Sequence, residues 1–580
     1  MTAGSYAFPA VIDRRAESTT DELDAMLADL TAAAPRWVGA SLDERMALLE
    51  RVMEATAAAA PAWVADACEA KGIELGGPLD WEEWYGGPTL VVRNARLLRD
   101  TMRDLRDHGR PIPPGPVTQR ADGQTIVGVY PTDNWDKLLG GGMTGEVWME
   151  PGINPGNLKA AMAKHYRPEV TAEPEVCLVL GAGNVSSIGP MDVLYQLFYY
   201  QRTAILKTNP VNEWVGPHWE QALAPLVEAD VLRIAYGGAE VGQYLVDHDA
   251  VAAIHITGSD KTYDAIVFGP GEEGAERKAA DDPRIHKPVT AELGNVSPVI
   301  VIPGPWSDDD IAYQADHIAG SLVQNAGFNC NATRVVITHQ HWNQREQLIE
   351  AIKESLARHP QRMPFYPGAE DRWERFMDEH PHAHVVGDQG PGCVPWTFIE
   401  DVNPDQHDSI VFTVEAFNGV FGETALDVER DVPTFIRAAV DFANHVHWGT
   451  LSATVLAHPS SLADPVIGPA IEEGIANLRY GSIGLNVWAA AAYAATSTTW
   501  GAFPGHHRTD IQSGVDVVHN TYLFDHPQKT VMRAPFRSTP PPLWHVGSPM
   551  VGAARGLPAF EADPRLGNVP GVLAAALKRG

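Results

Sequence analysis

Cysteine is scarce in this sequence, which has four among its 580 residues: Cys68, Cys177, Cys330 and Cys393. The four lie far apart and form no C-x-x-C pair, so we expect neither a disulfide framework nor a metal site. Free thiols are typical of a reducing compartment. Residues 1–16 also lack the basic stretch and apolar run of a secretory signal, so the sequence predicts a cytoplasmic protein.

Positive charge is also in short supply, because 43 Lys and Arg oppose 74 Asp and Glu and leave a formal net charge of −31. Such a chain repels phosphate backbones, which makes nucleic acid a poor candidate partner. A dinucleotide is still compatible, since backbone N–H groups and helix N-termini hold a pyrophosphate whatever the global charge. Long apolar runs are missing too: the alanine-rich stretches 57–67 and 489–495 are too short to span a bilayer.

The chain does have length and apolar content, with 44% hydrophobic residues, and it is too long for one compact core. Residues 18–105 have helical periodicity, and Ser41-Leu-Asp-Glu44 resembles a capping box. Residues 109–170 change to proline and glycine clusters around short β-like runs, which favours loops and hairpins. The proline-rich tail from about residue 527 is expected to be an extended arm.

From residue 175 onward, apolar strands alternate with helical stretches, which is typical of parallel α/β sheets. One series ends near residue 292 and a second follows it. We therefore expect an α/β fold divided into residues 1–292, 293–485 and 486–580. The expected strands are 176–180, 203–206, 231–235, 252–257, 299–302, 335–338 and 411–414.

Three residues in these series are candidates for catalytic chemistry. Cys330 lies in a polar, glycine-containing stretch, which suits an accessible thiol at a loop–helix junction, where a helix N-terminus favours the thiolate. Glu292 ends an apolar strand, and Asn184 lies in a glycine-rich turn after another. Taken singly, each has a structural alternative: a small buried hydrophobe, a satisfied acid and an ordinary turn residue.

Taken together, the order and spacing of such landmarks resemble the aldehyde dehydrogenase superfamily over about residues 175–505. The resemblance implies a Rossmann-like cofactor domain within 1–292, an α/β catalytic domain at 293–485, and a C-terminal return segment at 486–580 with a β-hairpin oligomerisation element. The landmarks are Asn184, Lys207, Thr257-Gly258-Ser259, Glu292-Leu-Gly294, Cys330, Glu415-Ala-Phe417, Ala443-Asn444 with Gly449, and Asn486.

The resemblance also implies a chemistry, the NAD(P)-dependent oxidation of an aldehyde to a carboxylic acid. Cys330 would attack the aldehyde, the Asn184 amide would hold the oxyanion, and hydride transfer would leave a thioester. Glu292 would activate the water that releases the acid. The cofactor-binding residues implied by the resemblance are Lys207 and Glu415 at the ribose hydroxyls, Phe417 near the nicotinamide, and Gly258 and Ser259 at the pyrophosphate.

Three positions depart from the family pattern. Tyr263 stands where a second glycine of the nucleotide turn is usual, and Phe328 where glutamine is common two residues before the nucleophile. Pro210 replaces a glutamate that would repel a 2′-phosphate, so we expect NADP to be accepted, alone or alongside NAD. Phe328, Tyr195 and Trp488 are candidate apolar lining for the aldehyde, or ordinary core.

Two other functions stay open at this point. A CoA-acylating aldehyde dehydrogenase or acyl-CoA reductase has the same fold and the same cysteine, although Glu292 argues against it because transfer to a thiol needs no water-activating base. A catalytically silent scaffold is the second alternative. By resemblance we also expect a homo-oligomer, a dimer or tetramer, in which residues 125–149 or 515–524 extend a neighbour's sheet.

Overall fold

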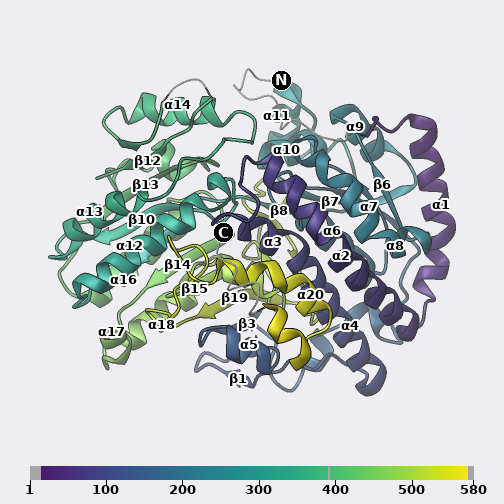
Figure 1. The fold of residues 1–580 in the computed structure, drawn as a ribbon, viewed down its shortest axis with the longest axis horizontal. Coiled ribbons are helices and arrows are strands. Elements are labelled where there is room, and N and C mark those ends of the chain that lie inside the picture. The colour runs from purple at the N-terminus through teal and green to yellow at the C-terminus, as the bar shows by residue number, and fades with distance from the viewer. Residues whose placement is uncertain (1–14, 390–391, 573–580) are drawn as a thin grey trace.

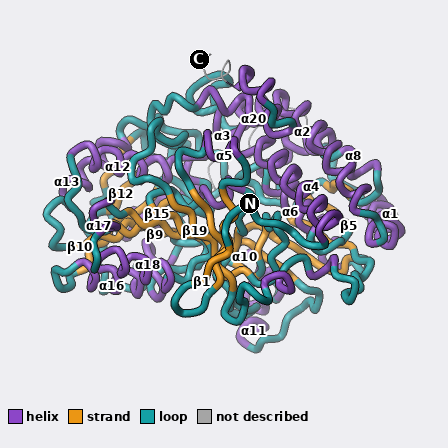
Figure 2. The backbone as a smooth tube through the Cα atoms, turned by 90° about the horizontal axis from the view of Figure 1, so that it is seen from below, coloured by secondary structure: helices purple, strands orange, loops and turns teal. Residues whose placement is uncertain are grey.

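The computed structural model describes residues 15–389 and 392–572, and this part of the chain folds around two large β-sheets. The predicted α/β class is confirmed. Figure 1 shows the first sheet and its helices on the right and the second sheet on the left and below. In Figure 2 the strands run through the middle of the molecule and helices cover them. None of the described helices combines the length and the apolar content that a membrane span requires.

Helices form the N-terminal part, as predicted. The predicted capping box is present: the Ser41 hydroxyl accepts the N–H of Glu44, and the Glu44 carboxylate accepts the N–H of Ser41. The same arrangement opens the preceding helix. The elements are α1 (Thr20–Val38), α2 (Leu42–Ala70), α3 (Trp81–Trp84), the short π-helix η1 (Tyr85–Thr89) and α4 (Leu90–His108).

The first sheet has six strands in the order β17-β8-β7-β4-β5-β6, all parallel except β17. Its strands are near-continuous apolar runs because helices cover both faces. The strands are β4 (Val176–Leu180), β5 (Thr203–Lys207), β6 (Leu232–Ala235), β7 (Val251–Gly258), β8 (Val289–Leu293) and β17 (Gly514–Val515). The helices are α6 (Ile188–Phe198), α7 (Gly216–Ala222), α8 (Ala224–Glu228), α9 (Ala239–Asp247), α10 (Asp260–Val267) and α11 (Gly271–Ala279), with a 3-10 helix η4 (Pro210–Val215) before α7.

The second sheet has eleven strands in the order β1-β2-β3-β19-β15-β14-β9-β10-β13-β12-β11. Its parallel centre runs from β19 to β12. The central and outer strands are β9 (Ser297–Val301), β10 (Thr333–His339), β11 (His384–Val386), β12 (Trp396–Ile399), β13 (Val420–Leu426), β14 (Ser452–Leu456) and β15 (Ser482–Leu485). The helices are α12 (Asp308–Val323), α13 (Arg345–Leu356), α14 (Ala369–Glu379), α15 (Ile410–Thr413), α16 (Val432–His445), α17 (Pro459–Ala463), α18 (Ile467–Asn477) and α19 (Ala490–Ala495).

One predicted strand, 411–414, is wrong. The segment is the helix α15, because the Ser409 hydroxyl accepts the N–H of Val411 and the Glu379 carboxylate accepts the N–H of Ile410. A short apolar run has no period long enough to separate a buried strand from a buried helical turn. The actual strand is β13, which starts six residues after Val414.

The stretch 125–149 is a hairpin, as expected, but it pairs within its own chain. Strands β2 (Thr125–Tyr130) and β3 (Thr144–Met149) flank α5 (Asn134–Leu139), and β1 (Val117–Gln119) adds an outer strand. Strand β3 pairs with β19 (Pro527–Arg533), and β19 pairs in parallel with β15. The stretch 515–524 likewise contributes to β17 and to β18 (Val517–Val518), which pairs with β16 (Trp500–Gly501).

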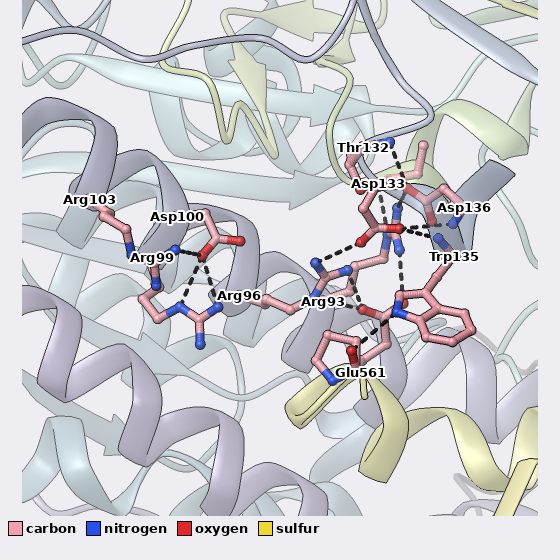
Figure 3. A network of polar contacts seen from close by, with 12 residues as sticks. Arg93, Arg96, Arg99, Asp100, Arg103, Thr132, Asp133, Trp135, Asp136 and Glu561 are labelled. Carbon is pink, nitrogen blue, oxygen red and sulfur yellow. Dashed lines mark hydrogen bonds and ion pairs between the residues drawn. The ribbon is translucent and has the colours of Figure 1, made fainter. Parts of the chain in front are cut away.

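The C-terminal tail is not an extended arm, which corrects the prediction. After β19 the chain returns across the molecule and ends its described part in the short helices η6 (Val551–Gly556), α20 (Leu557–Ala562) and η7 (Leu566–Asn568). Helix α20 lies beside α2 and α4 (Figure 1). Its Glu561 is buried between Arg93 and Arg96 of α4, and Figure 3 shows this network. A compositional pattern does not reveal such a distant ionic anchor.

Candidate active site

The candidate site is a cavity of about 1620 Å³ between the two sheets. The carboxyl ends of the parallel strands in the first sheet open into it, which is where open α/β sheets bind ligands. Residues of the second half of the chain form its other wall. All eight residues predicted for the site line this one cavity: Asn184, Lys207, Gly258, Ser259, Glu292, Cys330, Glu415 and Phe417.

Cys330 and Glu292 both line the cavity. Glu292 comes from β8, is 4% exposed and accepts the indole N–H of Trp500 at 3.0 Å. Burial raises the pKa of its carboxyl to about 7, against the lowering effect of that hydrogen bond. The Cys330 thiol is partly exposed, and burial together with the carboxylate of Glu292 raises its pKa well above the usual value. The charge of Glu292 therefore favours the protonated form of the Cys330 thiol.

The predicted surroundings of the thiol are wrong in one respect. Cys330 lies between the 3-10 helix η5 (Gln324–Gly327) and strand β10, so no helix begins after it. A helix dipole does not lower its pKa here.

Asn184 follows β4 at the turn before α6, as predicted. Its side chain is 7% exposed, and its amide donates to the Phe328 carbonyl at 2.9 Å. That contact fixes the amide beside the backbone two residues before Cys330. One amide hydrogen and the Cys330 backbone N–H are then available for an oxyanion.

Other residues that line the cavity have features that suit a dinucleotide. Ser259 is the N-cap of α10, where its hydroxyl accepts the N–H of Thr262 at 3.2 Å. The first backbone N–H groups of α10 thus point at the cavity and suit a pyrophosphate. Lys207 ends β5, and burial lowers the pKa of its amine to about 8, although Glu213 and Glu17 raise it. At neutral pH most of this amine is protonated.

Glu415 supplies a second sign that a polar ligand fits. One of its carboxylate oxygens, Oε1, is buried without a hydrogen-bond partner. Burial raises the pKa of this carboxyl to about 8, and Arg334 opposes that shift. An unpaired buried acceptor is costly, and a ribose hydroxyl would satisfy it. Gly294 leaves room for this carboxylate, because a Cβ there would lie 2.0 Å from its other oxygen.

Three aromatic residues considered for the aldehyde pocket belong to the core. Phe328 is fully buried in a cluster with Phe365, Tyr366 and Phe417. Tyr195 stacks on a neighbouring tyrosine, and the Trp488 indole donates to the Asn331 carbonyl. None of the three lines the cavity, so the structural alternative stated for them is the right one.

The site also contains residues that sequence reasoning missed. The Trp500 indole donates to Glu292, and the Arg334 guanidinium donates to the carbonyls of Gly327 and Asn418, which holds the loop that carries Cys330. Trp500 is 208 residues from Glu292 in the chain, so no local signal connects them. No group of three or more His, Cys, Asp or Glu side chains among the described residues is placed to hold a metal ion.

Comparison with known proteins agrees with this geometry. A family model described as "Aldehyde dehydrogenase family" matches residues 202–369. N-succinylglutamate 5-semialdehyde dehydrogenase 1 of Caulobacter vibrioides is 32% identical over 146 residues, 25% of this chain and 27% of that protein. 4-trimethylaminobutyraldehyde dehydrogenase of Bos taurus is 29% identical over 165 residues, 28% of each chain. The matched segment thus spans about a quarter of the length of these curated relatives.

Solved structures match over a much larger share of the chain. Aldehyde dehydrogenase C of Pseudomonas syringae aligns with a TM-score of 0.57 at 17% identity, over 92% of this chain and 93% of that one. Lactaldehyde dehydrogenase of Escherichia coli aligns with a TM-score of 0.54 at 17% identity, over 90% and 94%. At this identity the likeness concerns the fold. A segment of the chain thus matches the model of the aldehyde dehydrogenase family, and the fold as a whole is that of solved aldehyde dehydrogenases.

Proposed function

We propose that this protein oxidises an aldehyde to a carboxylic acid with NAD or NADP, through a thioester on Cys330. The observation that supports the proposal is that one cavity is lined by Cys330, Glu292 and Asn184 and also by the residues expected to hold a dinucleotide. The cofactor would supply the hydride acceptor. Ser259 and the N-terminus of α10 would hold its pyrophosphate, and Lys207 and Glu415 its riboses.

The chain's own residues then account for the remaining steps. Glu292 takes the thiol proton, and the Cys330 sulfur forms a bond to the aldehyde carbon. The Asn184 amide and the Cys330 N–H stabilise the resulting oxyanion, a contribution of about 3–4 kcal/mol for such a donor. Loss of hydride from this carbon leaves a thioester. Glu292, once its proton has left the site, removes a proton from water, and the hydroxide expels the sulfur as the acid forms.

Glu292 is also the reason to favour hydrolysis over transfer to CoA. A carboxyl with a pKa of about 7 is close to ideal for a general base at neutral pH. Transfer of the acyl group to a thiol would not require it. The silent scaffold is disfavoured because Cys330, Glu292 and Asn184 all line the same cavity.

The test is a rapid-mixing measurement of NAD(P)H formation. The full chain is mixed with NAD or NADP and a panel of aldehydes, with and without CoA. Wild type should give one equivalent of reduced cofactor per site in a burst, and Cys330→Ala none. Cys393→Ala is the matched control, because this thiol is also partly exposed but does not line the cavity. A burst that survives Cys330→Ala would refute the proposal.

A further inference from the structure

A buried lysine, Lys71, lies behind residues 324–330, the loop that carries Cys330 and that we call the nucleophile loop. Lys71 follows the last residue of α2, and its ammonium donates to the Glu83 carboxylate at 2.8 Å, to the Asn184 backbone carbonyl at 3.1 Å and to Asn325 Oδ1 at 3.0 Å. The Lys71 and Glu83 side chains are each 4% exposed. Three acceptors match the three hydrogens of an ammonium, so this charge is fully paired in the core. Two of the acceptors belong to the loops that hold the oxyanion donor and the nucleophile.

The nucleophile loop is strained where Lys71 contacts it. Asn325 and Ala326 have φ of 54° and 57°, in the left-handed region, although neither is glycine. Each such residue costs roughly 1–2 kcal/mol and persists only where its surroundings impose it. Here the Asn325 N–H donates to Glu82 at 3.2 Å, and Glu82 accepts two hydrogen bonds from Arg362.

The same asparagine joins the two loops. The Asn325 side-chain amide donates to the carbonyls of Asn184 and Phe328 at 3.0 and 3.2 Å, and the Asn184 amide donates to the Phe328 carbonyl. Lys71 orients this amide, because its ammonium occupies the oxygen end and leaves the nitrogen end facing the carbonyls. The separation between the Asn184 amide and the backbone before Cys330 therefore depends on Lys71, which does not itself line the cavity.

We propose that Lys71 is a positioning residue for formation of the thioester. Its ammonium fixes the left-handed turn at Asn325 and so places Cys330 and the Asn184 amide at the spacing that attack on a carbonyl requires. Misplacement by about 1 Å costs on the order of 100-fold in rate. This inference rests on the proposed function and adds to it a residue from the N-terminal helices.

The test variant is Lys71→Met combined with Glu83→Leu. Removal of both charges leaves no unpaired ion in the core, which keeps the chain folded. We expect the burst rate constant to fall roughly 10- to 100-fold, with the dissociation constant of the cofactor unchanged. Asn325→Gly is the second variant, since glycine adopts the left-handed turn and removes the amide through which Lys71 acts. It should slow the burst in the same way.

Two further measurements separate positioning from general stability. Hydrogen exchange at residues 324–330 and alkylation of Cys330 by iodoacetamide should both become faster in the two variants, while the burst becomes slower. Glu561→Gln is the matched control, because it perturbs an equally buried ionic contact of α4 that does not contact either loop. It should leave exchange at 324–330 and the burst unchanged.

The outcomes separate the two proposals. A burst rate within twofold of wild type in both variants overturns the role of Lys71, and so does unchanged exchange at residues 324–330. If wild type gives no burst with any aldehyde, the proposed function fails. Exchange and alkylation then still decide whether Lys71 holds the loop, because neither measurement needs a substrate.

Discussion

Replacement of Glu292 by glutamine tests the proposed base directly. The amide has the same shape, and its oxygen can still accept the Trp500 indole N–H that now binds the carboxylate at 3.0 Å. The fold should therefore be kept. Thioester formation should become slower but survive, because a thiol is far more acidic than water and still ionises without the base, whereas hydrolysis requires a base to activate water. A general base contributes about 10²- to 10⁴-fold, so steady turnover should fall by roughly 10³-fold while the burst amplitude stays near one per site.

The pH dependence follows from the same carboxyl. Burial raises its pKa from 4.5 to about 7, and only the ionised form accepts a proton from water. Steady turnover of the wild type should rise about tenfold per pH unit up to about pH 7 and then level off. In Glu292→Gln this rise should disappear. The amplitude of the burst should not rise with pH in this way.

The free energy of unfolding should fall as pH rises, whereas steady turnover should rise. The unfolded carboxyl titrates near 4.5 and the folded one near 7. Glu292 therefore favours folding fully below pH 4.5, and its contribution is lost as pH rises to about 7. The difference of about 2.5 pKa units corresponds to roughly 3 kcal/mol. We therefore compare the free energy of unfolding in urea for Glu292→Gln and for wild type. The value for the variant minus the value for wild type should be larger at pH 8 than at pH 4.5.

The assays are stopped-flow fluorescence of NAD(P)H for burst and steady rate, and urea unfolding at the two pH values. Glu423→Gln is the control, because Glu423 is also fully buried but pairs with Arg345 outside the cavity. Its turnover per folded molecule should match wild type. A steady rate within twofold of wild type in Glu292→Gln would show that the carboxyl does not act as the deacylating base.

Other substitutions give equally definite expectations. Cys330→Ser should abolish the burst without changing the unfolding midpoint, since a hydroxyl is a far weaker nucleophile; normal turnover would exclude Cys330. Glu561→Ala removes the partner of Arg93 and Arg96 and should cost about 3–5 kcal/mol, seen as earlier urea unfolding, with turnover per folded molecule unchanged. Pro210→Glu should raise the KM for NADP more than that for NAD through charge repulsion; equal changes would show that position 210 does not face the ribose.

The sequence by itself determined the parts that depend on local pattern and chain order. Short apolar runs predicted strands such as β4 and β5, and the Ser41 capping box predicted the start of α2. Part of the site was predictable because Asn184, Lys207 and Glu292 each end or follow a strand of a parallel sheet, and such ends meet at one edge. Asn184, Lys207 and Glu292 therefore share a cavity although they are far apart in sequence.

Only the tertiary structure decided what depends on distant contacts. The pKa of Glu292 and that of Cys330 come from burial and from each other, which no local pattern encodes. The tail packs on α4 through Glu561, more than 460 residues from its arginine partners. In the sequence, Lys71 is only a charged residue at the end of a predicted helix. In the structure its ammonium donates to Asn325, 254 residues later. Hydrophobic periodicity predicts which face of a helix or strand is buried. Which other element packs against that face is decided only when the whole chain folds.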